Sequence, residues 1–200
     1  MRTTRALMLT VIVVSSATLA AQQNGGPKVT PQDLLDGLKD PSRWLTYSGD
    51  YFGHRHSPLT QITPENVHQL AAQWTFQTGT QGSFQTTPLV IDGVLYVTGF
   101  NNHAWAIDAR SGRQIWHYRR ELPEDMHLCC GTVNRGFGVL GDRLFMTTAD
   151  AHLLALDMRT GGVAYDVTLA DYKLGYSATV APLGTLTRPS CAGWRWIGTG

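Results

Sequence analysis

The stretch that decides the fold is GVLYVTGFNNHAWAIDARSG, at residues 93–112. It recurs 49 residues later, without a gap, as DRLFMTTADAHLLALDMRTG at residues 142–161. Each copy predicts a strand, a turn, a second strand and an Asp-x-Arg-Ser/Thr-Gly turn, followed by an outer strand with an aromatic residue, Trp116 or Tyr165. A period near 50 residues with about four strands per unit is typical of a β-propeller blade. The sequence therefore predicts an all-β propeller, and the length of the match argues against a sandwich with chance similarity.

The surrounding sequence supports antiparallel β structure. Asp92-Gly93 is a strong signal for a tight hairpin turn. In the later turns, Asp108 and Asp157 can accept hydrogen bonds from backbone amides, and the glycine that follows permits a positive φ. Short apolar strands are expected at residues 73–76, 88–91, 94–98, 104–107 and 114–118.

The number of repeats is too small for a closed ring. A propeller uses roughly four to eight blades, whereas this chain holds two clear copies with partial flanks. We interpret residues 44–183 as the first two to three blades of a larger propeller. Alternation is lost at residues 184–200, and we expect this aberrant tail to reflect a frameshift or truncation near Leu183.

The N-terminus resembles a secretory signal. Arg2 and Arg5 precede an apolar run at residues 6–19 that is too short to span a membrane comfortably, and small residues follow. We expect a signal peptide at residues 1–21, a lead-in at residues 22–43 and a periplasmic location. A membrane anchor is the alternative, but no basic cluster follows the run. No membrane span is expected after cleavage.

Composition narrows the possible partners. Hydrophobic residues make up 42% of the chain and charged residues 16%, which indicates a globular protein. The formal net charge is +1, and no basic patch or run of like charges is present. Nothing therefore recommends nucleic acid or an anionic membrane surface as a partner.

Two adjacent cysteines stand between the repeats, at the start of CCGTVNRG (residues 129–136). A bond between Cys129 and Cys130 would close a small strained ring that staples no fold, because it closes almost no loop. It could instead make a rigid apolar platform. Two separately buried free thiols are the alternative. Export to an oxidising compartment makes the bond chemically possible, and Cys191 is then the odd cysteine.

Two histidines in the irregular segment before the repeats are candidate metal ligands. His54 and His56 are one residue apart, and the sequence shows no third ligand near them. Such a pair is more often found at the surface or in hydrogen bonds. The segment lies between a helix expected at residues 31–38, capped by Thr30, and a helical turn expected at residues 63–67.

Several of these segments together resemble the PQQ-dependent alcohol dehydrogenases, the methanol and ethanol dehydrogenase type of quinoprotein. The resemblance covers residues from about 40 to 183 and is carried by residues 44–59, residues 61–67, the blade turns and above all the paired cysteines followed by Asn134-Arg135-Gly136. It implies an eight-bladed propeller that holds pyrroloquinoline quinone (PQQ) against a calcium or lanthanide ion.

The resemblance also implies roles for individual residues. Cys129 and Cys130 would form a disulfide lying against the quinone, and Arg135 would donate hydrogen bonds to quinone oxygens. Thr147, or the adjacent Thr148, would contact the cofactor's carboxylates. Gln85 stands where relatives often have a cofactor-binding glutamate, so the negative charge is lost there.

The implied activity is oxidation of an alcohol to an aldehyde, with a cytochrome c as the electron acceptor. The catalytic aspartate and the metal ligands are expected beyond the end of this chain, so we expect the chain alone to be inactive. A non-catalytic propeller scaffold is the alternative. A membrane-bound quinoprotein acting on sugars is a third, and the absence of several N-terminal membrane spans argues against it.

Overall fold

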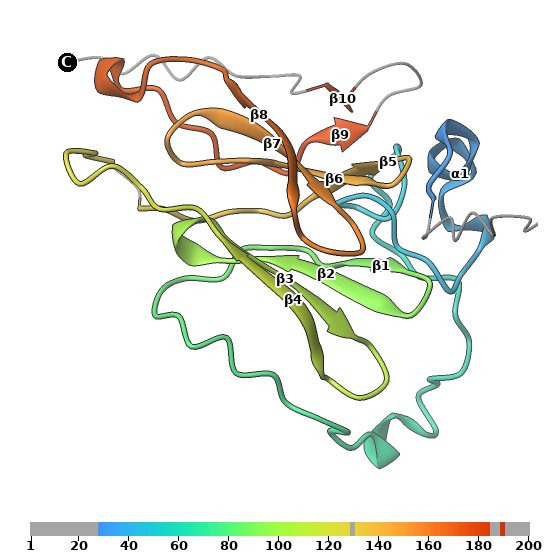
Figure 1. Cartoon of the computed structure of the whole chain (residues 1–200). Helices are drawn as coiled ribbons and strands as arrows, with labels where there is room; N and C mark the ends of the chain where they lie inside the picture. Colours follow the sequence, from blue (N-terminus) through green and yellow to red (C-terminus); the bar gives the residue numbers. More distant parts are fainter. Residues whose placement is uncertain (1–27, 129–130, 185–188, 191–200) are drawn as a thin grey trace, which may run out of the picture.

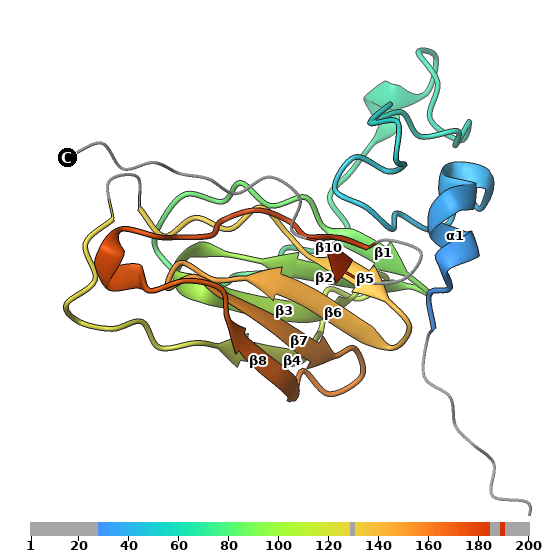
Figure 2. The ribbon, with the colours of Figure 1, turned by 90° about the horizontal axis from the view of Figure 1, so that it is seen from above.

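The computed structural model describes residues 28–128, 131–184 and 189–190. Its main feature is a pair of four-stranded antiparallel sheets that lie one on the other (Figures 1 and 2). Each sheet is a simple meander in which every strand pairs with the next one in the chain. The first sheet contains β1 (Leu89–Ile91), β2 (Val94–Thr98), β3 (His103–Asp108) and β4 (Gln114–Arg119), and the second contains β5 (Gly138–Leu140), β6 (Arg143–Thr147), β7 (His152–Asp157) and β8 (Val163–Thr168).

The two sheets repeat with the 49-residue register of the sequence. Val94 pairs with Asp108 in the first sheet, and Arg143 pairs with Asp157 in the second. The predicted hairpin turn lies at Asp92-Gly93, where both residues have positive φ, of 50° and 78°. A tight turn of this hand matches the natural twist of the flanking strands. The strand pattern and this turn are therefore as the sequence predicts.

The Asp-x-Arg-Ser/Thr-Gly turns are built in the same way in both repeats. In the first, Asp108 Oδ1 accepts hydrogen bonds from the backbone N–H groups of Arg110 (3.1 Å) and Ser111 (2.8 Å). Asp157 accepts the equivalent pair of bonds, at 3.1 and 2.9 Å. The glycines that close the turns have φ of 71° and 72°. The predicted role of these aspartates is confirmed.

A tryptophan locks the first sheet onto the second. Trp116 in β4 is buried, and its Nε1–H donates to the backbone carbonyl of Met158 at 2.9 Å. Its ring lies over Gly161, where a Cβ atom would come within 2.7 Å of the ring. The aromatic residue of the first outer strand therefore covers part of the second sheet. Tyr165, at the same position in β8, is 42% exposed.

An equivalent contact precedes the first sheet. Trp74 Nε1–H donates to the carbonyl of Ala109 at 3.1 Å, and its ring lies over Gly112. The strand expected at residues 73–76 is nevertheless wrong, because these residues form no strand in the structure. A strand needs a neighbour to hydrogen-bond with, and the described part of the chain offers none at this position.

The N-terminal lead-in packs against one side of the sheets (Figure 2). Helix α1 (Pro31–Asp36) begins after Thr30, which caps it as the sequence predicts. The structure adds a reciprocal bond from Asp33, so that the two residues form a capping box. Val29 bridges to Gly141. The expected helical turn at residues 63–67 is displaced, with a short 3₁₀ turn at Val67–Gln69. Further 3₁₀ turns are Gly37–Lys39, Phe100–Asn102 and Tyr172–Leu174.

One apolar core joins the lead-in to both sheets. It contains Leu34 from the lead-in, Leu45 from the segment that follows it, Tyr96 and Trp116 from the first sheet, and Met146 from the second, among other buried residues. Burial of apolar area is the main favourable term in folding. The lead-in is therefore part of the fold rather than a detached arm.

The first strand of each repeat is its inner strand: β1 in the first repeat and β5 in the second. A third inner strand begins beside the second sheet. β9 (Leu183–Gly184) pairs with β10 (Pro189–Ser190), and a Cβ atom at Gly184 would lie 2.7 Å from the carbonyl oxygen of Val139 in β5. Residues 185–188 and 191–200 of the expected aberrant tail lie outside the described residues, as does the expected signal peptide. The frameshift stays a prediction. The described helices include none that is both long and apolar enough to cross a bilayer.

Candidate functional site

Three chain segments that enter successive inner strands lie side by side, with Arg135 in the middle. The backbone N–H of Arg135 donates to the carbonyl of Thr179 at 3.0 Å, and its carbonyl accepts from the N–H of Thr87 at 3.3 Å. These segments lead into β5, β9 and β1 respectively. Because main-chain bonds fix Arg135 on both sides, its side chain leaves the backbone at a defined place.

Gly136 lets these segments approach closely. Its φ is 127°, and a Cβ atom at this position would lie 3.0 Å from the carbonyl oxygen of Thr87. A side chain here would be strained by its backbone conformation and would press on the neighbouring chain. The glycine of the Asn-Arg-Gly sequence is therefore required by the packing next to Arg135.

The guanidinium group of Arg135 is partly buried and donates from Nη1 to the hydroxyl of Thr179. Among the described residues no carboxylate pairs with it. An arginine has five N–H donors in a planar fork. The site therefore offers a fixed positive charge and several remaining donors, which suits a planar ligand with acceptor oxygens.

Thr179 was missed by the sequence interpretation. The signal lay in the third, incomplete copy of the repeat, where Thr179 stands a few residues before β9 as Arg135 stands before β5. Thr179 lies 44 residues after Arg135 rather than 49, so comparing positions 49 residues apart does not pair the two. Asn134 was named only as part of the Asn-Arg-Gly motif and was given no role of its own. It is buried and donates from Nδ2 to the carbonyl of Thr147 at 2.7 Å.

Thr147, a predicted cofactor contact, lies next to this site. It is fully buried, and its hydroxyl donates to the carbonyl of Val180 at 2.7 Å. Thr148, the adjacent alternative, accepts a hydrogen bond from the N–H of His152 at 3.1 Å. Both hydroxyls are thus engaged within the protein, and a cofactor contact from either remains a prediction.

The other predicted contacts are placed less completely. Gln85 is exposed and precedes Thr86, whose hydroxyl lies 3.0 Å from that of Thr98. Its side chain is thus near the entry to β1, and its cofactor role remains a prediction. Cys129 and Cys130 lie outside the described residues, so their disulfide also remains a prediction.

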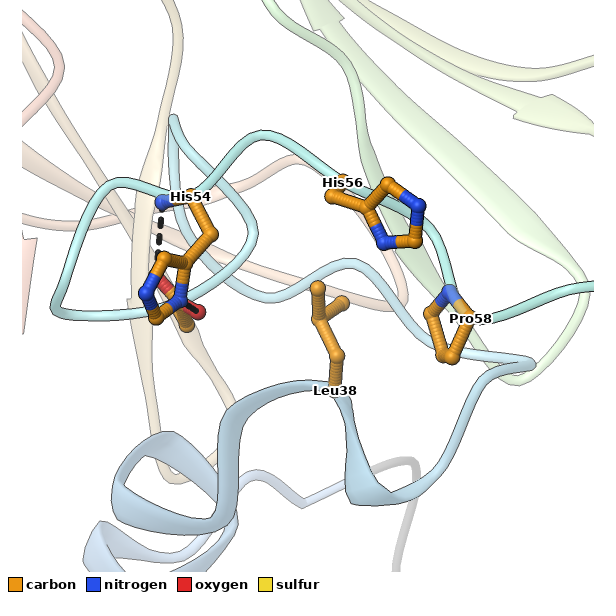
Figure 3. A pocket seen from close by; sticks show the side chains of 5 residues that line it. Leu38, His54, His56 and Pro58 are labelled. Atoms are coloured by element: carbon orange, nitrogen blue, oxygen red, sulfur yellow. Dashed lines mark hydrogen bonds and ion pairs between the residues drawn. The ribbon is translucent and has the colours of Figure 1, made fainter.

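His54 and His56 line a separate cavity of about 410 Å³ with Leu38, Asp50 and Pro58 (Figure 3). His54 Nδ1 lies 2.5 Å from Asp50 Oδ2, and its backbone N–H donates to Asp50 Oδ1 at 3.1 Å. Burial raises the pKa of the Asp50 carboxyl, but the bonds with His54 outweigh it and lower that pKa. No group of three potential metal ligands occurs among the described residues. The expectation that these histidines are surface or hydrogen-bonding residues is confirmed.

A charged cluster ties the outer edges of the two sheets together. Arg120, just after β4, pairs with Asp150 through Nε at 2.8 Å and with Asp166 through Nη1 at 2.6 Å. His152 Nδ1 lies 2.6 Å from Asp166 Oδ1. Burial raises the pKa of the Asp166 carboxyl, but the bonds with His152 and Arg120 outweigh it and keep that pKa below its usual value. All four charged or titratable groups of this cluster have partners within it. The cluster therefore serves to hold the two sheets together.

Comparison with known proteins decides the family. A family model described as the β-propeller domain of glucose, ethanol and alcohol dehydrogenases, with the short name PQQ, matches residues 44–167. The chain belongs to the PQQ-dependent alcohol dehydrogenase family. This confirms the resemblance read from the sequence and the assignment of the two sheets as propeller blades.

Individual relatives agree with the family. A 1-butanol dehydrogenase (quinone) of Thauera butanivorans is 38% identical over 174 residues, which cover 86% of this chain and 28% of the relative. A quinoprotein ethanol dehydrogenase of Pseudomonas aeruginosa is 36% identical over 156 residues, covering 77% and 25%. This chain thus spans less than a third of the length of either relative.

Solved structures show the same partial match. A europium-containing methanol dehydrogenase superposes with a TM-score of 0.72 at 32% identity, over 77% of this chain and 28% of the other. A quinohemoprotein alcohol dehydrogenase from Comamonas testosteroni gives a TM-score of 0.70 at 28% identity, over 78% and 24%. The similarity therefore extends to the backbone of this part of the propeller.

Proposed function

We propose that the full-length protein carrying this chain oxidises an alcohol to an aldehyde with PQQ, and that the chain supplies the N-terminal blades and one side of the cofactor site. The observation that carries the proposal is Arg135, held between the entries to three inner strands with its guanidinium unpaired by any described carboxylate. The names of the relatives, which include butanol and ethanol dehydrogenases, support an alcohol as substrate.

The residues around Arg135 fit the chemistry of PQQ. The cofactor is planar and carries carboxylates and quinone oxygens, all of them hydrogen-bond acceptors at neutral pH. Arg135 offers a planar set of donors with a fixed charge, and such charge-assisted bonds are the stronger ones. When bound, PQQ supplies the two-electron acceptor for the alcohol.

The chain's own residues would bind and orient the cofactor. Arg135 would donate hydrogen bonds to its oxygens, and Thr179 holds the guanidinium in place for this. Gln85 would offer a hydrogen-bonding amide, without the negative charge of the glutamate that relatives often have there. Cys129 and Cys130, if joined, would form the flat apolar surface on which a planar ring system can lie.

The remaining parts of the proposal concern the rest of the enzyme. A calcium or lanthanide ion would be held by residues outside the described part of this chain, and a europium-containing methanol dehydrogenase among the solved structures supports the presence of a metal ion. A relative named 1-butanol dehydrogenase (cytochrome c) supports a cytochrome c as electron acceptor. The signal-like residues 1–21 support a periplasmic location.

Reconstitution tests the proposal. The full-length protein is incubated with PQQ and either calcium or a lanthanide, and oxidation of primary alcohols is followed with an electron-accepting dye. Dye reduction should require the alcohol, PQQ and a metal, and residues 1–200 alone should give no turnover. A folded full-length protein that binds no PQQ would contradict the proposal and would favour the scaffold alternative.

A further inference from the structure

A buried amide fixes the loop that carries Arg135. Asn134 is 1% exposed, and each end of its amide group is hydrogen-bonded. Nδ2 donates to the carbonyl of Thr147 at 2.7 Å, and Oδ1 accepts from the N–H of Gly136 at 3.0 Å. The first bond reaches the last residue of β6, and the second closes a local turn around Arg135.

From this geometry we propose that Asn134 is a positioning residue for Arg135. Its side chain ties the loop to a strand of the same blade, so that the guanidinium leaves the loop at one place and in one direction. The inference rests on the proposed function, in which Arg135 binds the cofactor. Asn134 itself acts through Arg135 and needs no contact with the cofactor.

The strength of the tie follows from its burial. A hydrogen bond to a buried group is costly to break, because the group left behind cannot form a hydrogen bond with water instead. The backbone of Arg135 is already bonded to Thr87 and Thr179. Asn134 adds a bond to β6, so the arginine is held by three neighbouring segments of the chain.

The first repeat shows what this position looks like without an arginine. Counting 49 residues back, Gln85 replaces Asn134 and Thr86 replaces Arg135. Gln85 is exposed, whereas Asn134 is buried. The buried amide therefore occurs in the repeat that has an arginine to hold, which favours a positioning role over a general requirement of the blade.

A matched pair of substitutions separates positioning from stability. Asn134→Asp keeps the acceptor for Gly136 but places a carboxylate oxygen against the carbonyl of Thr147, and so breaks the tie to β6. Asn102→Asp is the control. Asn102 is also 1% exposed, its Oδ1 accepts from the N–H of Ala149 at 3.1 Å, and its Nδ2 has no partner among the described residues. Both variants bury a new carboxylate, but only Asn134→Asp changes a side-chain bond made by the loop of Arg135 itself.

The measurements are made on the full-length protein, with PQQ as the probe. Wild type and both variants are titrated with PQQ, and kcat and KM for a primary alcohol are measured on the loaded enzymes. We expect Asn134→Asp to weaken PQQ binding about tenfold or more, because a small misplacement of a binding group has a large effect. Asn102→Asp should change it less than about twofold at a similar melting temperature.

The outcomes distinguish the two proposals. Equal weakening by both variants, or unchanged affinity in Asn134→Asp, would overturn the positioning role. If wild type binds no PQQ, the proposed function fails. The ¹⁵N NMR signal of the Arg135 side chain then tests, in the free protein, whether Asn134 positions that side chain. That signal should shift in Asn134→Asp and in Asn134→Ala, and not in Asn102→Asp. An unshifted signal would overturn the inference even if the enzyme binds PQQ.

Discussion

The two repeats have the same strand order and the same Asp-x-Arg-Ser/Thr-Gly turn, yet they differ at both edges of the blade. At the inner edge the first repeat has Thr86-Thr87, and the second has Arg135-Gly136 at the same register. The threonine hydroxyl of Thr86 is used within its own blade, on Thr98, whereas the guanidinium of Arg135 reaches the next segment at Thr179. The repeated positions build the frame, and Arg135, at a position that breaks the repeat, would make the proposed cofactor contact.

The outer edge differs in charge. In the first repeat His103 Nδ1 lies 2.9 Å from His117 Nε2, and in the second His152 and Asp166 occupy the equivalent positions. Burial lowers the pKa of His103, and His117 and Arg119 lower it further. Burial and Arg119 also lower the pKa of His117. The histidine pair at the first edge thus disfavours a protonated imidazole. At the second edge the carboxylate of Asp166 favours a positive charge beside it.

The largest expected effect is at the seam between the blades. Trp116→Ala removes a ring that is 7% exposed, together with its bond to Met158, and leaves a cavity over Gly161. We expect the free energy of unfolding to fall by about 3–5 kcal/mol. Urea denaturation followed by circular dichroism measures it.

Tyr165→Ala is the matched control, at the same register in the second blade. Because Tyr165 is 42% exposed in this chain, its loss should cost about 1 kcal/mol or less. In the full-length protein a third blade should cover it, and the cost should rise toward that of Trp116→Ala. Equal costs in residues 1–200 would contradict the distinction between a covered and an uncovered blade.

A smaller effect is expected where the second repeat has glycine and the first has threonine. Gly136→Ala should lower the free energy of unfolding by about 1–3 kcal/mol, because φ is 127° and the new Cβ atom would lie 3.0 Å from the carbonyl of Thr87. Gly141→Ala is the control, since Gly141 also has a positive φ, of 64°, but has no atom within 4 Å of the new Cβ. Equal losses would show that the close approach is absent in solution.

The smallest effect concerns the histidine pair. Because the pKa values of His103 and His117 are lowered in the fold, the unfolded chain binds protons more readily, and wild type should lose stability as the pH falls below about 6.5. His117→Asp makes the first edge like the second and should raise the pKa of His103. The difference in the free energy of unfolding between pH 7.5 and pH 5.5 should then be smaller than in wild type or reversed in sign. The change from wild type should be less than about 1 kcal/mol, because the site is partly exposed. His56→Asp, at an exposed site, should leave the difference unchanged.

The sequence predicted the frame well because the frame depends on local signals. The turn at Asp92-Gly93, the bonds accepted by Asp108 and Asp157 and the cap at Thr30 all act within a few residues. The site depends on contacts between blades. The bond from Arg135 to Thr179 joins residues 44 positions apart, and no local pattern marks it.

The one wrong strand has the same cause. Residues 73–76 have the composition of a strand, and Trp74 contacts the first blade as Trp116 contacts the second. A strand also needs a partner, which its own sequence does not contain. The proposed role of Arg135 follows from the sequence only through resemblance to a family, because a single arginine has many possible uses.

The most direct test of the account is the affinity of the full-length protein for PQQ with and without the arginine. We predict that Arg135→Ala weakens PQQ binding at least about tenfold, and that Arg135→Lys recovers only part of it, since an ammonium group lacks the planar fork. Arg55→Ala, at an exposed arginine in the segment before the first sheet, should leave the affinity unchanged. Equal affinity of wild type and folded Arg135→Ala would contradict the central claim that Arg135 is part of the cofactor site.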